Sequence, residues 1–172
     1  MKAAQQIVSF LPSATEIACA LGLSDQLVGI THECDYPEEI VGKPIVVRNA
    51  LPIETMSQRE IDQAVAQRMR EGRSLYEVDE KLLQALAPDL ILTQDLCQVF
   101  APSGNEVSQA LSLLPKTPQI LWLTPNSLEQ IMENVRDLGA ATDRRNEAQE
   151  LIAAGRARLE AIAAVTRSLS DR

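Results

Sequence analysis

Short apolar runs alternate with amphipathic stretches along most of the chain, a pattern typical of α/β folds. The run from Asp89 to Thr93 (DLILT) is the clearest predicted strand, and its apolar character favours a central parallel strand covered on both faces. The predicted strands cover residues 7–10, 27–30, 45–47, 89–93 and 119–123, with a weaker strand or turn at 75–78. We therefore predict an α/β fold with a parallel sheet flanked by helices.

Polar residues with the spacing of helix caps separate the apolar runs. Ser13 with Glu16, and Ser57 with Glu60, match the capping box, in which each side chain accepts from the backbone amide of the other residue. Further helix starts are predicted at Asp79, Ser103, Ser127 and Asp143, and helix ends at Gly22, Gly72, Pro88, Leu114 and Gly139. The helix before Gly72 carries an apolar face made of Ile61, Val65 and Met69.

The last predicted helix is longer than the others and carries one apolar seam. It runs from Asp143 to about Ser168, beyond the ~11–12 residues typical of globular helices. The seam consists of Leu151, Gly155, Leu159, Ile162, Val165 and Leu169. It either lies on the protein's own sheet, which suits its first half better than its last two turns, or packs against a partner. The chain thus divides into a lobe (residues 1–142) and a long helix (residues 143–172).

The composition is that of a globular, acidic chain. Of 172 residues, 45% are apolar, and the formal net charge of −8 repels phosphate backbones, so no nucleic-acid partner is expected. No apolar run approaches the ~20 residues of a membrane helix. Pro12, Ser13 and Glu16 interrupt the N-terminal apolar stretch that an export signal would need, which favours either a cytoplasmic location or a chain that has lost its export signal.

Ligands of open parallel sheets bind beyond the carboxyl ends of the strands. The loops predicted at that edge cover residues 11–15, 31–36, 48–51, 94–97 and 124–126. Free amides near Ser13 and Ala14 could meet an anionic or carbonyl group, although simple helix capping explains the same residues. The second loop holds the densest polar cluster of the chain, including the only histidine, His32. Both loops are predicted to open on one edge and to form part of a binding wall.

Metal-capable side chains stand in two of these loops, at His32, Cys34, Asp95 and Cys97. Thiolate and imidazole together suit zinc or another borderline-soft metal, so a metal-dependent enzyme is one hypothesis. The spacing within each loop is unspecific, and polar turn residues lining a cleft are the simpler interpretation. The Pro-Cys-x-x-Cys segment of zinc deaminases is absent from the sequence, and no oxyanion partner for Cys–His catalysis is recognisable.

Three segments together resemble a known family. They are LPSATEIACALGLSDQLVGITHECDYP (residues 11–37), PDLILTQDLC (residues 88–97) and the last strand with its SLEQI helix. They look like the cobalamin-type substrate-binding proteins of ABC importers, which have the class III periplasmic-binding fold. The resemblance implies two Rossmann-like lobes joined by a long helix, a ligand between the lobes, no catalysis and no cofactor beyond the ligand. It implies a protein that handles cobalamin or a related metal chelate in ABC-type import, in the periplasm.

Carried over residue by residue, the resemblance places Pro12, Ser13 and Ala14 against the corrinoid, together with Asp35 and Tyr36. The rest of the candidate ligand-binding set is His32, Gln94 and Asp95. Glu106 lies where the family has a surface glutamate that docks to arginines of the importer membrane subunits. Glu106 would also be a favourable residue in the first turn of its predicted helix, because the helix dipole attracts negative charge there. The docking role and the helix-stabilising role are compatible.

The resemblance covers the N-terminal lobe and the linking helix, so we expect the second wall of the cleft to be missing from this chain. Tight sites bury ~70–90% of their ligand, so binding by this chain alone is expected to be weak. The expected partners are a corrinoid or other metal chelate and the importer membrane subunits. The competing hypothesis is a homodimer formed through the seam of residues 151–169, with a vestigial cleft.

Overall fold

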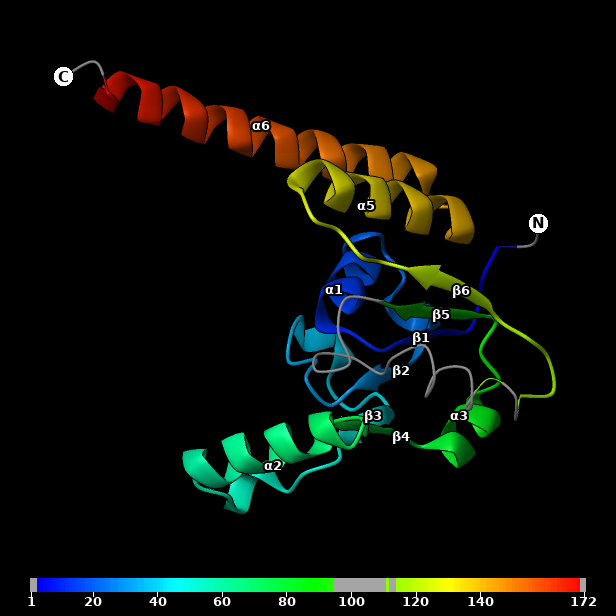
Figure 1. The fold of residues 1–172 in the computed structure, drawn as a ribbon. Helices are drawn as coiled ribbons and strands as arrows, with labels where there is room; N and C mark the ends of the chain where they lie inside the picture. Colours follow the sequence, from blue (N-terminus) through cyan, green and yellow to red (C-terminus); the bar gives the residue numbers. More distant parts are fainter. Residues whose placement is uncertain (1–2, 95–110, 112–113, 171–172) are drawn as a thin grey trace.

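Six strands form one sheet in the order β4-β3-β2-β1-β5-β6 (Figure 1). The computed structural model describes residues 3–94, 111 and 114–170. The strands are β1 (Ile7–Ser9), β2 (Leu27–Thr31), β3 (Ile45–Asn49), β4 (Tyr76–Val78), β5 (Leu90–Thr93) and β6 (Gln119–Trp122). Neighbouring strands are parallel except β3 and β4, which are antiparallel. The predicted α/β fold with a parallel sheet is confirmed, and the ambiguous segment near residue 76 is an antiparallel edge strand.

Helices connect the strands and flank the sheet. They are α1 (Pro12–Ala20), α2 (Gln58–Arg70), α3 (Glu80–Leu86), α5 (Leu128–Thr142) and α6 (Arg145–Ser170). The helix predicted from Ser103 to Leu114 lies largely outside the described residues. Helix α1 packs on β1 and β2, α3 packs on β2 and β3, and α5 packs along α6. Among the described residues, no helix combines the length and the apolar character needed to cross a bilayer.

The centre of the sheet is buried on both sides, which explains the nearly uninterrupted apolar runs in the sequence. Every residue of β1 and β5 is buried. Gly29 in β2 allows the side chains of Val46 on β3 and Leu86 on α3 to come close. A Cβ at position 29 would lie 2.5 Å from Val46 Cγ2 and 2.9 Å from Leu86 Cδ1. These contacts hold β2 against its neighbours and set the position of the loop that follows it.

Three of the predicted helix caps are present. Ser57 N donates to the Glu60 carboxylate at 2.7 Å, and Ser57 Oγ accepts from Glu60 N at 3.4 Å. Asp79 and Ser127 also accept from backbone amides at the starts of α3 and α5. The capping box predicted at Ser13 and Glu16 is wrong, because Leu11 is the N-cap residue of α1 and Ser13 lies inside the helix.

The predicted boundary between the last two helices is wrong by a few residues. Helix α5 continues through Gly139 to Thr142, and Asp143 ends it in the left-handed conformation, with φ of 60°, instead of capping α6. Aspartate tolerates this conformation better than most residues. Gly139 is needed for the close approach of the two helices, because a Cβ there would lie 2.6 Å from Ala148 Cβ.

The apolar face of helix α2 is only partly covered, with Ile61 and Val65 half-buried. No residue of α2 is buried, and Met69 is 54% exposed. The helix lies beyond the β4 end of the sheet instead of covering it (Figure 1). Arg68 anchors the helix by donating to the carbonyl oxygens of Ser74 at 2.7 Å and Ala50 at 3.1 Å.

Helix α6 packs along α5 with its first half and extends past the rest of the molecule with its second half (Figure 1). Ala148 and Ile152 are buried, whereas Leu159 is 40% and Ile162 60% exposed. Of the predicted seam residues, Leu151 and Gly155 are half-buried where α6 packs along α5, not on the sheet, and Leu159, Ile162 and Val165 are exposed.

Candidate functional site

Strands β1, β2, β3, β5 and β6 end at one edge of the sheet, because these strands are parallel. The first two loops are in direct contact at this edge. Thr15 Oγ1 lies 3.2 Å from Cys34 Sγ, and the two groups share a hydrogen bond. The predicted meeting of these two loops at the carboxyl edge is therefore confirmed.

The first loop passes directly into α1. Leu11 is the N-cap residue and provides no side-chain cap for the helix. Pro12 is half-buried and Ser13 is exposed, whereas Ala14 is completely buried. A ligand at this edge would thus reach Pro12 and Ser13 before Ala14.

The second loop holds His32 in a fixed orientation. His32 Nδ1 lies 3.1 Å from the carbonyl oxygen of Val47 and 3.3 Å from Thr31 Oγ1. The imidazole ring also packs on Tyr76, with ring centroids 6.2 Å apart and a tilt of 53°. His32 is half-buried and borders a hollow at this edge of the sheet.

Tyr76 connects the edge strand β4 to the same loop. Its hydroxyl donates to Glu33 Oε1 at 3.2 Å. Burial, with the nearby Glu33 carboxylate, raises the pKa of Tyr76 to about 12. The phenol therefore remains a neutral hydrogen-bond donor throughout the physiological range. Sequence reasoning missed this contact, since an antiparallel partner from 43 residues away leaves no local pattern.

A hollow of about 560 Å³ lies beside His32, at the carboxyl ends of β2 and β3. Its lining consists of His32, Arg48, Asn49, Ala50, Leu51, Pro52 and Glu54. Arg48 supplies a positive charge to this wall, and the hollow coincides with the predicted loop at residues 48–51. Glu54 is an addition that the sequence pattern did not single out.

The remaining predicted site residues are spread along the same edge. Asp35 and Tyr36 are exposed, Tyr36 with 64% of its surface, and Gln94 is half-buried directly after β5. The other two ligand-binding or metal candidates in that loop, Asp95 and Cys97, lie outside the described residues, as does Glu106.

Metal candidates among the described residues do not form a cluster. Within residues 3–94, 111 and 114–170, no three His, Cys, Asp or Glu side chains lie close enough to hold a metal ion. Burial raises the pKa of the Cys34 thiol, and the hydrogen bond with Thr15 opposes this effect only in part. Cys34 is therefore a protonated thiol that shares a hydrogen bond with Thr15.

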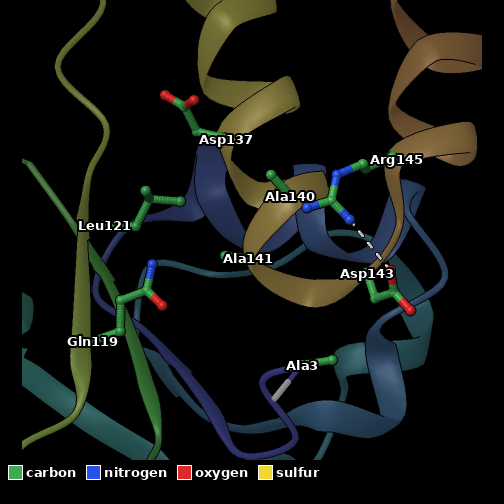
Figure 2. Close-up of a pocket in the computed structure, with 8 residues that line it drawn as sticks. All are labelled: Ala3, Gln119, Leu121, Asp137, Ala140, Ala141, Asp143 and Arg145. Atoms are coloured by element: carbon green, nitrogen blue, oxygen red, sulfur yellow. Dashed lines mark hydrogen bonds and ion pairs between the residues drawn. The ribbon is translucent and has the colours of Figure 1, made fainter. Parts of the chain in front are cut away.

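A second hollow, of about 490 Å³, lies at the opposite, amino edge of the sheet (Figure 2). Gln119 and Leu121 of β6 line one side, and the carboxyl end of α5 lines the other. Arg145 and Asp143 form an ion pair of 3.3 Å at its rim (Figure 2). None of the predicted ligand-binding residues borders this hollow, so a substitution in it can serve as a control for substitutions at the carboxyl edge.

Known proteins resemble this chain in sequence and in fold. The vitamin B12-binding protein of Vibrio campbellii is 29% identical over 159 residues, covering 92% of this chain and 46% of that protein. The periplasmic vitamin B12 binding protein of Vibrio cholerae superposes with a TM-score of 0.65 at 24% identity, covering 91% of this chain and 49% of that chain. A periplasmic heme binding protein of Pseudomonas aeruginosa gives 0.64 at 22% identity, covering 96% and 49%.

The chain thus spans about half the length of the relatives it matches. The match to the family described as Periplasmic binding protein extends over residues 7–172, which is nearly the whole sequence. Sheet order, long terminal helix and family match agree, and the chain belongs to the periplasmic binding protein family.

Proposed function

We propose that this chain is the N-terminal lobe and linking helix of a substrate-binding protein for cobalamin or a related metal chelate. Residues 1–142 form one wall of the ligand site, and residues 143–172 form the interlobe helix. Its role is ABC-type import or corrinoid handling on the outer side of the membrane, with binding and release as the only chemistry. The importer membrane subunits are its proposed partners, with Glu106 as the docking residue.

The observation that carries this proposal is the contact between the first two loops at the carboxyl edge. Thr15 Oγ1 and Cys34 Sγ are 3.2 Å apart, which brings Ser13 and Asp35 to the same side of the sheet. The adjacent hollow of about 560 Å³ continues this wall toward β3. Ligands of open parallel sheets bind at this edge.

The relatives support the ligand class. The two Vibrio proteins are named for vitamin B12 and the Pseudomonas protein for heme. Both compounds are flat macrocycles that hold a transition metal. An exposed tyrosine, a carboxylate and a cation along one wall suit the mixed apolar and polar rim of such molecules.

Calorimetric titration with cobalamin tests the proposal. We expect binding weaker than ~1 μM, because a single wall buries only part of the ligand. Asp35→Ala and Tyr36→Ala should weaken it further. Arg145→Ala, in the hollow at the opposite edge, is the matched control and should bind as wild type does.

Two results would contradict the proposal: no measurable heat with any metal chelate, or loss of binding in Arg145→Ala but not in the loop variants. Affinity of 1 μM or better would instead refute the prediction that a second wall is required.

A homodimeric interaction module is the second candidate function. The later turns of α6 favour it, since Leu159 and Ile162 are 40% and 60% exposed on a helix that extends past the lobe. Exposed apolar seams of this kind mark interaction surfaces.

A further inference from the structure

We infer that His32 binds the metal of the ligand directly, as an axial ligand through Nε2. This inference rests on the proposed function, because it assumes that a metal chelate occupies the carboxyl edge. It adds a coordination bond where the proposed function requires only surface contact.

The hydrogen bonds of His32 determine which ring nitrogen carries the proton. Nδ1 lies 3.1 Å from the Val47 carbonyl oxygen, which can only accept, so Nδ1 must be the protonated donor. In the neutral ring, Nε2 then carries the lone pair. Among the described residues, no hydrogen-bond partner occupies Nε2.

Val47 is a buried residue of β3, so its carbonyl group is a fixed partner. Metal-binding histidines usually donate their second ring N–H to a carbonyl or carboxylate, which orients the ring and increases its basicity. The Tyr76 ring, 6.2 Å away, restricts the imidazole from another side. His32 therefore has the supporting contacts of a metal ligand without a metal cluster around it.

A chelated metal needs only one protein donor. The macrocycle supplies the four in-plane nitrogens, and the protein completes an axial position, for which imidazole nitrogen is suitable. The step is a ligand exchange: the bond from Nε2 to the metal forms, and the bond from the metal to an axial water breaks. No electron is transferred, and the neutral ring gives up no proton when its Nε2 lone pair forms this bond.

The surroundings of His32 have room and charge for a macrocycle edge. The hollow of about 560 Å³ begins at His32 and continues along residues 48–52. Arg48 places a cation in its wall, which suits acidic substituents such as the propionates of haem. Cys34, the other metal-capable side chain of the loop, is engaged with Thr15 and has a raised thiol pKa.

Four probes distinguish coordination of the metal by His32 from simple contact with the macrocycle. Each probe is titrated into the full chain, and binding is followed by visible absorption. Haemin and aquocobalamin have an exchangeable axial position. Metal-free protoporphyrin and cyanocobalamin are their counterparts, since one has no metal and the other has both axial positions filled. We expect wild type to shift the metal-centred bands of haemin or aquocobalamin, and His32→Ala to abolish the shift and weaken binding about tenfold.

In His32→Ala, the two counterparts should bind within about twofold of wild type, and added imidazole should restore the shifted bands in the haemin or aquocobalamin complex. A response to haemin alone would assign a haem-type ligand, and one to aquocobalamin alone a corrinoid. Identical spectra and affinities in wild type and His32→Ala would overturn axial ligation while leaving the proposed function intact. Failure of wild type to bind any of the four probes would overturn both.

Discussion

Single residues at the carboxyl edge are held by contacts with distant strands. Tyr76, from the antiparallel strand β4, packs on His32 and donates to Glu33. Val47 provides the carbonyl group that orients His32. The loop after β2 is therefore held from the side of β3 and β4, in addition to its contact with the first loop through Cys34 and Thr15.

The Glu33 carboxylate contributes to the elevated pKa of Tyr76. Glu33→Gln should lower this pKa from about 12 toward the ordinary value of about 10, although burial, the larger cause, will keep it elevated. Ultraviolet titration in a Tyr36→Phe background makes Tyr76 the only reporting tyrosine. An unchanged pKa would mean that burial alone accounts for the shift.

The same pKa shift has a consequence for stability at high pH. The folded-state pKa is raised, so the stabilisation is complete below about pH 10 and is lost as the pH rises toward 12. Tyr76→Phe should reduce the loss of unfolding free energy across this interval, as measured by urea unfolding. An equally steep loss in the variant would assign the alkaline destabilisation to other groups.

At the scale of elements, α5 and α6 form a closely packed hairpin. Gly139 lies against Ala148 and the Arg144 carbonyl oxygen, at distances of 2.6 Å and 2.8 Å from a Cβ placed at position 139. Arg156 on α6 also donates to Glu129 on α5 at 2.7 Å, and this contact lowers the pKa of Glu129. The hairpin holds the first half of α6 in a defined direction.

Gly139→Ala should therefore destabilise the protein by about 1–3 kcal/mol, because backbone and Ala148 must move to admit the methyl group. Gly155→Ala in α6 is the matched control. No atom lies within 4 Å of a Cβ at position 155, so the better helix propensity of alanine should stabilise the protein by about 0.5–1 kcal/mol. Urea unfolding measures both variants, and equal effects would refute the close-packing argument.

At the scale of the whole molecule, a sheet edge with open loops lies beside a helix that extends past the lobe (Figure 1). An apolar groove of about 390 Å³ runs between α1, α5 and α6. Its lining includes Ile131, Met132 and Leu159, and Ile162 follows one turn later. Exposed apolar surfaces of this kind mark sites of association with another folded unit.

If the chain associates with itself through this surface, its sedimentation coefficient should increase with concentration. Ile162→Glu should abolish the increase, because a carboxylate would be desolvated in the interface. Ala164→Glu adds the same charge to an exposed position on roughly the opposite side of α6 and should associate as wild type does. A monomer at every concentration would exclude the homodimer hypothesis.

Local patterns determined much of this protein. Apolar runs specified the strands, and capping residues such as Ser57 and Asp79 specified helix starts, because both signals act over only a few residues. Parallel connectivity followed from the alternation of strands and helices, and the carboxyl ends of parallel strands share one edge, which is where Ser13 and Asp35 were expected. The sequence also identified the seam of α6 and its open later turns.

Only the tertiary structure decided the contacts between residues far apart in the chain. The orientation of His32 depends on Val47, and the ionisation of Tyr76 depends on Glu33, neither of which has a local signature. The close approach of α6 likewise decided the roles of Gly139 and Asp143. Glycine often ends a helix, but Gly139 lies inside α5, and Asp143 ends that helix instead. Long-range packing selects among conformations that local sequence leaves nearly equal in free energy.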